Sequence, residues 1–281
     1  MVRIMTRKFK GLLSALCVFF CAGTANLSAV NFDYVQPFAL NPVNEGVELG
    51  IGALLSGSAL ICDKFVHIKT NNFDAEALNK SAIPTLDQIF MRPYSKPLHI
   101  AGTGTMALTM AIPAIFAILP SKEWLTIGTM YAETLLIANG IKEWTKLLVH
   151  RARPYMYFDG YPMDKVADGD WDSSFPSGHT TLAFAGAAFA TMVFCQCFPD
   201  SNWKYGVAAG SFGLALITGI LRMLSGNHYL TDVLVGAVIG TACGFLVPYL
   251  HTKGFYSKFE RRSDGARASV TPSGLTFSYN F

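Results

Sequence analysis

Two apolar stretches joined by a short polar turn decide the fold, and they read YGVAAGSFGLALITGILRMLSGNHYLTDVLVGAVIGTACGFLVPYL from residue 205 to residue 250. Both are apolar around the whole helix rather than along one stripe, which is typical of helices with no face toward water. About 20 such residues cross the hydrocarbon core of a bilayer. We therefore expect a transmembrane helical hairpin formed by 205–224 and 229–250.

Upstream of the hairpin, three further stretches are long and apolar enough to span, at 98–119, 124–148 and 179–198. Their frequent glycine and alanine are expected where helices approach closely in lipid. A shorter, glycine-rich run at 47–62 is left open as an additional span. The predicted fold class is all-α, a polytopic membrane helical bundle with five to six spanning helices. Glu133 lies within one stretch and is expected either to pair with a neighbouring helix or to cap a polar pocket.

The composition excludes several classes of protein. Hydrophobic residues make up 51% of the 281 residues and charged residues only 15%, whereas a soluble domain carries about 25% charged residues. The high apolar content excludes disorder, and six cysteines are too few for a disulfide scaffold of this length. A net charge of +3 is too small to indicate nucleic acid as a partner.

The N-terminus has the order of a secretory signal, with basic residues, an apolar run at 11–22 and then small residues. An uncleaved signal anchor fits the same order. The last residues, LTFSYNF, are expected to form an accessory strand or a disordered end. The predicted organisation is a signal peptide or signal anchor at 1–29, an exoplasmic segment at 30–97, the membrane domain at 98–250 and a basic tail at 251–281.

The connections between the five long stretches are short, apart from a polar loop at 150–178. This alternation places the end of the second stretch, the start of the third, the end of the fourth and the start of the fifth on one side of the membrane. Basic residues at Lys122, Lys204 and in the tail assign the other side to the cytoplasm by the positive-inside rule. With an export signal, we expect the converging ends to face the periplasm or exterior from the cell (inner) membrane. A sixth span at 47–62 would reverse this parity.

The first polar cluster at the converging ends is a pair of cations, Lys146 and Arg153, seven residues apart. At about 100° per residue, seven steps return to nearly the same face of a helix. We therefore expect both side chains to address one anion, before Pro154 ends the helix.

The second cluster reads FPSGH at 175–179 and opens the stretch 179–198. Gly178 lets backbone N–H groups approach a ligand, Ser177 offers a hydroxyl, and a helix N-terminus attracts anions. His179 can exchange a proton near neutral pH.

The third cluster reads RMLSGNHYLTD at 222–232. On a helix, His228 and Asp232 would share a face, and the carboxylate would hold one ring nitrogen and make the other a better nucleophile. Arg222 ends the preceding helix and reaches across the turn. Together the three clusters form a site for a tetrahedral oxyanion, while no cluster of carboxylates, Cys or His marks a metal site. The sequence thus predicts phosphate chemistry without a metal or other cofactor.

These clusters resemble the signature of the type 2 phosphatidic acid phosphatase/vanadium haloperoxidase superfamily, in its membrane-bound lipid phosphatase branch. The signature, Lys-x6-Arg-Pro, Pro-Ser-Gly-His and Ser-Arg-x5-His-x3-Asp, corresponds here to 146–154, 176–179 and 222–232. One position departs from it, because Leu221 stands where the pattern often has Ser.

The resemblance implies a phosphatase that works through a phosphohistidine. His228 would attack phosphorus, Asp232 would orient its ring, and His179 would protonate the leaving oxygen. The residues implied to hold the phosphate oxygens are Lys146, Arg153, Ser177, Gly178 and Arg222.

The expected substrate is a lipid phosphate or diphosphate at the membrane–water boundary, such as phosphatidic acid, phosphatidylglycerophosphate, a prenyl diphosphate or lipid A. Three alternatives stay open: a soluble-type periplasmic acid phosphatase, a vanadium haloperoxidase, and a non-catalytic membrane protein that retained the pocket. The aromatic residues of the loop 150–178 fit either an interfacial belt or a substrate lid.

Overall fold

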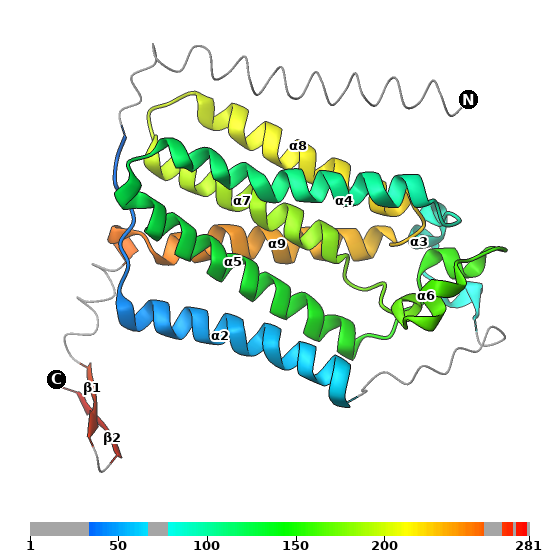
Figure 1. The fold of residues 1–281 in the computed structure, drawn as a ribbon, viewed down its shortest axis with the longest axis horizontal. Coiled ribbons are helices and arrows are strands. Elements are labelled where there is room, and N and C mark those ends of the chain that lie inside the picture. Colours follow the sequence, from blue (N-terminus) through cyan, green and yellow to red (C-terminus); the bar gives the residue numbers. More distant parts are fainter. Residues whose placement is uncertain (1–33, 67–77, 256–265, 272–273, 280–281) are drawn as a thin grey trace. The chain divides into compact units, whose positions relative to one another are not determined.

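The computed structural model describes residues 34–66, 78–255, 266–271 and 274–279. The expected all-α bundle is confirmed, and Figure 1 shows its long helices lying side by side. The signal predicted at 1–29 lies outside the described residues. The long helices are α2 (Pro42–Ile61), α4 (Lys96–Ala111), α5 (Ser121–Leu148), α7 (Gly178–Cys197), α8 (Trp203–Leu224) and α9 (Leu230–Leu250).

Helix α7 is the centre of the bundle, because it packs against α4, α5, α8 and α9. It can be enclosed on every side because its buried positions are mostly small, and α9 turns glycines toward it. A Cβ on Gly240 would lie 2.1 Å from the carbonyl oxygen of Thr181, and one on Gly244 would lie 2.5 Å from that of Ala185. Small residues therefore set the spacing of the two helices, as in other helix pairs that meet in lipid.

The run left open in the sequence, 47–62, is a complete helix. Helix α2 lies along α5, with the hydroxyl of Ser56 donating to the Leu136 carbonyl (2.7 Å) and the indole of Trp144 donating to Ser58 (3.1 Å). The residue numbers of the two contacting pairs increase in the same direction along both helices, so α2 and α5 are parallel. Leu55 fits against α5 because Gly140 has no side chain.

Within the described residues, five helices are long and apolar enough to cross a membrane, so the chain is a multi-pass membrane protein. Helix α5 forms where a span was predicted, at 124–148, but it is not among these five candidates. The candidate spans among the described residues are Asn44–Phe65, Lys96–Ile118, Gly178–Cys197, Trp203–Leu224 and Leu230–Leu250.

The bundle has two ends, which we name by the helix termini that they contain. The site end contains the ends of α2, α5 and α8 and the starts of α4, α7 and α9; the far end contains the opposite termini. The chain before α2 and the chain after α9 meet at the far end, where Ala39 N donates to the His251 carbonyl (3.0 Å). The orientation predicted from five spans therefore does not follow from the helices, because α2 is a candidate span in addition to the five predicted stretches and reverses the parity.

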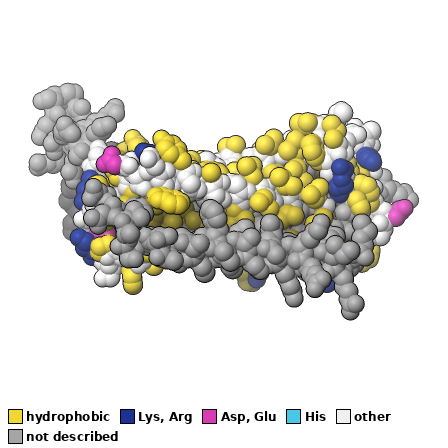
Figure 2. Space-filling model, turned by 90° about the horizontal axis from the view of Figure 1, so that it is seen from above, with side chains coloured by type: hydrophobic (Ala, Val, Ile, Leu, Met, Phe, Trp, Pro, Cys, Tyr) yellow, Lys and Arg dark blue, Asp and Glu magenta, His cyan; other side chains and the backbone are white. Residues whose placement is uncertain are grey.

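Short elements cover the site end and connect the helices. Surface side chains along the bundle are largely hydrophobic, as Figure 2 shows for one face, and Leu54, Leu125 and Val238 are each about 70% exposed. The C-terminal residues form a two-stranded antiparallel hairpin rather than a single strand. The remaining elements are η2 (Cys62–Val66), η3 (Lys80–Ala82), α3 (Thr85–Phe90), η4 (Ile112–Ile118), η5 (Pro154–Tyr157), α6 (Met163–Ala167), η6 (Asp170–Asp172), β1 (Ala266–Thr271) and β2 (Gly274–Tyr279).

Candidate functional site

The tight turn between α8 and α9 presents His228 to the interior of the site end. Gly226 occupies the left-handed region with φ +74°, and a Cβ there would lie 2.4 Å from the carbonyl oxygen of Arg92. The backbone N–H groups of Asn227 and His228 both donate to the Arg222 carbonyl (3.2 and 3.3 Å). Because only glycine can occupy this position of the turn, the turn has one backbone conformation, and that conformation determines the position of the His228 side chain.

The ring of His228 is held by its backbone surroundings and by one arginine. Its Nδ1 lies 2.7 Å from the Ser174 carbonyl, which can only accept, so Nδ1 carries the proton. Its Nε2 is therefore the lone-pair nitrogen, and Arg153 Nη1 donates to it at 3.2 Å. His228 is only 1% exposed. The geometry leaves one buried nitrogen free to act as a nucleophile.

His228 and Asp232 lie close together as predicted, but they do not share a helix face, because His228 precedes α9 rather than lying on it. Asp232 Oδ2 lies 3.6 Å from His228 Nδ1, which is too far for a hydrogen bond. Instead, that oxygen accepts from the Ser174 hydroxyl (2.5 Å) and from Tyr229 N (2.9 Å). Asp232 thus positions the first turn of α9. It also positions Ser174, whose carbonyl accepts from His228.

Arg151 joins Asp232 to a second buried carboxylate that the sequence analysis did not single out. Its guanidinium forms ion pairs with Asp232 and with Asp87 of α3 (2.6 Å to Asp87), and it covers the ring of Tyr229 at 4.0 Å. Asp87 also accepts from the backbone and the hydroxyl of Thr231 (3.0 and 2.6 Å). Burial opposes ionisation of Asp87, but these hydrogen bonds outweigh it and lower its pKa. Helix α3 is thereby attached to the start of α9.

Arg153 does not share a helix face with Lys146, contrary to the spacing argument, because α5 ends at Leu148. Its backbone N–H donates to the Trp171 carbonyl (2.7 Å). Its guanidinium donates to Asp170 (2.7 Å to the carbonyl and 2.6 Å to the carboxylate) and to the Asn227 carbonyl (3.1 Å). These contacts direct the Arg153 charge toward His228.

Burial and nearby charges determine the protonation states of Asp170 and His228. Burial raises the pKa of Asp170, but the charges of Arg153 and Lys165 outweigh it and hold that pKa well below the usual range. Burial also lowers the pKa of His228, and the positive charges of Arg153 and Arg222 lower it further. At neutral pH, His228 is therefore a neutral imidazole beside an ionised Arg153–Asp170 pair.

Lysines cover the N-terminus of α7. A Cβ on Gly178 would lie 3.4 Å from the Lys146 ammonium nitrogen and 3.2 Å from the stem of Lys142, so glycine leaves the space that these cations occupy. The hydroxyl of Ser177 is fully buried and bonds to Thr180 (2.8 Å), and Ser177 N donates to the Asp232 carbonyl (3.0 Å). The first turn of α7 is thus tied directly to the first turn of α9.

His179 lies opposite the lysines, toward α4. The hydroxyl of Thr103 donates to the His99 carbonyl (3.1 Å), so at 3.0 Å from His179 it accepts, and His179 carries its proton on Nε2. Arg222 is 1% exposed, and it donates to His99 Nδ1 at 3.0 Å. Gly102 of α4 provides the space for the Arg222 stem, which lies 3.1 Å from the position of its absent Cβ.

The structure brings the predicted residues together at the site end. Four of them are close enough to His228 to lower its pKa: Lys146, Arg153, Arg222 and His179. Their cations and the N-terminus of α7 suit an anion, and His228 Nε2 and the proton of His179 suit transfer chemistry on it. In the described part of the chain, the only group of His, Cys, Asp or Glu with metal-ligand spacing lies elsewhere.

The supporting residues Arg151, Asp87, Ser174, Thr103 and His99 escaped the sequence analysis for one reason. None is a specified position of the three clusters, although Arg151 lies between Lys146 and Arg153, and each contributes through a contact between elements distant in the chain. Among these five residues, Arg151 could have been found from the sequence, because it lies two residues before Arg153.

The chain is similar in sequence to several known proteins. The PAP2 superfamily model matches residues 127–256. The chain is 31% identical over 145 residues to the lipid A 1-phosphatase of Porphyromonas gingivalis, covering 47% of this chain and 31% of that protein. It is 27% identical over 210 residues to phosphatidylglycerophosphatase B of Bacillus subtilis, covering 72% and 93%.

A solved structure, a transmembrane PAP2 type phosphatidylglycerolphosphate phosphatase from Bacillus subtilis, is 23% identical with a TM-score of 0.44, covering 74% of this chain and 98% of that one. The chain spans about a third of the length of the Porphyromonas relative.

Proposed function

The chain belongs to the PAP2 superfamily, and from that premise we propose that it is an integral membrane phosphatase that hydrolyses a phosphate ester or diphosphate of a lipid. The observation that carries the proposal is the state of His228: buried, protonated on Nδ1, and with its Nε2 lone pair beside Arg153. A nucleophile held in this way needs no metal to act on phosphorus.

In the first step of the proposed reaction, the Nε2 lone pair of His228 forms a bond to phosphorus. The bond from phosphorus to the lipid oxygen breaks, and His179, in its doubly protonated imidazolium form, gives one proton to that oxygen. In the second step, water attacks phosphorus and loses a proton to His179, while the P–N bond breaks and returns the electron pair to His228. Orthophosphate leaves, and the enzyme is as it began.

The cations stabilise the charge that develops on the phosphoryl oxygens. Arg153, Arg222 and Lys146 approach from three different elements, which suits three equatorial oxygens. Backbone N–H groups at Gly178 add the partial positive charge of a helix N-terminus. Asp232 supports the positive ring of the phosphohistidine at a distance, through the Ser174 hydroxyl and the carbonyl that accepts from Nδ1.

A lipid substrate is supported by the surroundings of the site. The helices that carry it expose large apolar side chains along their length, so a substrate with acyl or prenyl chains can lie in the bilayer while its phosphate enters the site end. The names of two relatives, a lipid A 1-phosphatase and a phosphatidylglycerophosphatase, are those of lipid phosphatases. A soluble acid phosphatase is disfavoured, because it would not expose such surfaces.

The test uses purified protein in detergent and measures phosphate release from phosphatidic acid, phosphatidylglycerophosphate, a prenyl diphosphate and lipid A. We expect release from at least one of them, and no release by His228→Ala. A trapped phosphoenzyme should be acid-labile and base-stable, as expected for a phosphohistidine. Release by a folded His228→Ala protein at more than a few per cent of the wild-type rate would show that another residue is the nucleophile.

We also propose that the site faces the periplasm or exterior. The far end carries Lys122, Lys204 and Lys253, and the basic tail follows it, which the positive-inside rule assigns to the cytoplasm. With six long helices, this orientation requires that the apolar run at 11–22 does not add a crossing.

Single cysteines in a cysteine-free variant test the orientation. In intact spheroplasts, a membrane-impermeant maleimide should label a cysteine at exposed Asp159, on the site-end loop, but label one at Lys204 only after lysis. The reverse pattern would place the site in the cytoplasm.

A further inference from the structure

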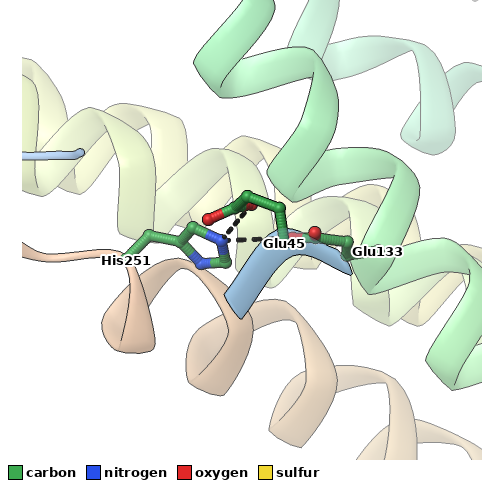
Figure 3. A group of neighbouring side chains, drawn as sticks. All are labelled: Glu45, Glu133 and His251. Carbon is green, nitrogen blue, oxygen red and sulfur yellow. Dashed lines mark hydrogen bonds and ion pairs between the residues drawn. The ribbon is translucent and has the colours of Figure 1, made fainter. Parts of the chain in front are cut away.

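A second group of buried polar side chains lies at the far end of the bundle. Glu45 of α2, Glu133 of α5 and His251, which follows α9, point toward one another (Figure 3). His251 Nε2 lies 3.0 Å from Glu45 Oε2 and 3.2 Å from Glu133 Oε2. One ligand atom from each of the three residues lies within 4.8 Å of the others. This spacing is that of ligands around one small ion.

The group is separate from the phosphatase site. Helix α9 (Leu230–Leu250) has 21 residues, with Asp232 in its first turn at the site end and His251 directly after its last residue at the far end. At 1.5 Å per residue, the two groups are about 30 Å apart. Neither Glu133 nor His251 has a place in the proposed reaction.

One carboxylate oxygen in the group has no protein partner. Glu133 is fully buried, and its Oε1 forms no hydrogen bond. Glu48, one turn after Glu45 on α2, also has a buried oxygen, Oε2, without a hydrogen bond. A buried carboxylate oxygen without a donor is strongly unfavourable. The other oxygen of Glu133, Oε2, lies 3.2 Å from His251 Nε2, so the unpartnered Oε1 belongs to a carboxylate of this group.

The charges of the group are not balanced within the protein. Two carboxylates, those of Glu45 and Glu133, contact one imidazole, and a third, that of Glu48, follows Glu45 by one turn of α2. No Lys or Arg in the described part of the chain forms an ion pair with them, and His251 is the sole ionic partner recorded there for Glu45 and Glu133. Even a protonated His251 would leave the group negative, whereas a divalent cation would compensate two carboxylates.

The atoms that face away from the centre of the group are held by the backbone. The Nδ1–H of His251 donates to the Val247 carbonyl (2.8 Å), which directs Nε2 at the carboxylates. Glu45 Oε1 accepts from Asn41 N (3.1 Å), which directs Oε2 to the same place. Imidazole and carboxylate ligands of metals are oriented by outer contacts of this kind.

We propose that Glu45, Glu133 and His251 bind one divalent transition metal ion. Two or three carboxylate oxygens with one imidazole nitrogen suit Zn²⁺ or Mn²⁺ better than Mg²⁺ or Ca²⁺, which take oxygen ligands alone. The ion would join α2, α5 and the end of α9, and so stabilise the bundle without acting on the substrate. No motif in the sequence indicates this site, because its ligands come from three distant parts of the chain.

The experiment measures metal directly on the purified full chain in detergent. The protein is stripped with a chelator, exposed to ZnCl₂ or MnCl₂, desalted and assayed by elemental analysis. We expect about one ion per wild-type chain, a loss of that ion in Glu133→Gln and in His251→Ala, and retention in His228→Ala. Glu123→Gln is the matched control, because Glu123 is another buried glutamate of α5 with an unpartnered oxygen, outside the group.

A second measurement keeps the test decisive if a variant does not fold. The ion should raise the Tm of the stripped wild-type protein, because a ligand that binds only the folded state stabilises it. Wild-type protein that binds neither Zn²⁺ nor Mn²⁺, or that binds them equally well in folded Glu133→Gln, overturns the proposal. Since the readout is metal content and not phosphate release, its failure is distinct from a failure of the proposed activity.

Discussion

The two ends of α9 place a buried histidine in opposite surroundings. His228 precedes the helix and His251 follows it, and each donates its Nδ1–H to a backbone carbonyl. Around Nε2 of His228 the neighbours are cations, with Arg153 at 3.2 Å. Around Nε2 of His251 they are the carboxylates of Glu45 and Glu133. The same side chain, held by the same kind of backbone contact, therefore faces opposite charge.

The difference appears in the protonation of the two rings. Burial lowers the pKa of both. At His228 the cations lower it further. At His251 the hydrogen bonds to Glu133, the Val247 carbonyl and Glu45 outweigh burial and raise the pKa to about 9. Neighbouring charge, rather than burial, thus decides whether a buried histidine is a neutral nucleophile or holds a proton that a bound metal ion would displace.

The largest effect on activity is expected when the cation beside His228 is removed. Arg153→Ala should lower kcat/KM by about 10²- to 10³-fold, because it deletes a donor to both the nucleophile and the phosphoryl oxygens. Metal binding at the far end should not change. Lys165→Ala is the control, since Lys165 contacts Asp170 (3.1 Å) but not His228, and a similar loss in that variant would contradict the assignment.

Arg151 tests whether a residue outside the reaction positions the site. Arg151→Gln should lower kcat by about 10- to 100-fold with little change in KM, because the variant loosens Asp232 and with it the Ser174 loop, while no substrate contact is lost. Arg151→Lys, which keeps the charge, should recover part of the loss. If KM rises instead and kcat stays constant, Arg151 binds the substrate.

The turn that presents His228 is tested by a pair of glycines. Gly226→Ala should lower the free energy of unfolding by more than about 2 kcal/mol, because the left-handed backbone and the contact with the Arg92 carbonyl both oppose a side chain. Gly160 also has positive φ but no atom within 4 Å, so Gly160→Ala should be less destabilising, by about 1 kcal/mol. Thermal unfolding in detergent measures both, and equal losses would show that the turn is not tightly packed.

The smallest expected effect is a shift in a pH profile. His228 must be neutral to attack, and burial with neighbouring cations keeps it neutral to lower pH than a free imidazole, so the acid limb of kcat/KM should lie below about pH 6.5. Arg153→Gln removes one of those charges and should move the limb to higher pH. A shift to lower pH in that variant would have the wrong sign for this mechanism. A short-chain, water-soluble phosphate substrate allows the measurement without lipid aggregation.

Much of the fold could be predicted because apolar runs are long and local. The runs at 205–224 and 229–250 became Trp203–Leu224 and Leu230–Leu250, and 179–198 became Gly178–Cys197. The run at 98–119 was found at the right place but is not one regular helix. It changes to a 3-10 helix at Ile112, where Pro113 removes a backbone donor.

The contacts of the site could be predicted less well than its members. Lys146 and Arg153, and His228 and Asp232, were assumed to lie on continuous helices. In each pair one residue lies outside the helix, because the chain leaves α5 at Leu148 and enters α9 only at Leu230. Spacing predicts a shared helix face only where both residues are helical, and a helix terminus is the position that spacing alone fixes least well.

The sequence by itself determined that this is a membrane bundle with cations, two histidines and an aspartate at converging helix ends. Those conclusions rest on local composition and on short motifs, which need no long-range contact. Only the tertiary structure decided that Ser174 holds His228, that Arg151 connects Asp87 to Asp232, and that Glu45, Glu133 and His251 meet at the far end. Each of these contacts joins segments far apart in the chain, and their distances are set by helix packing, in which Gly140, Gly240 and Gly244 control how closely the backbones approach.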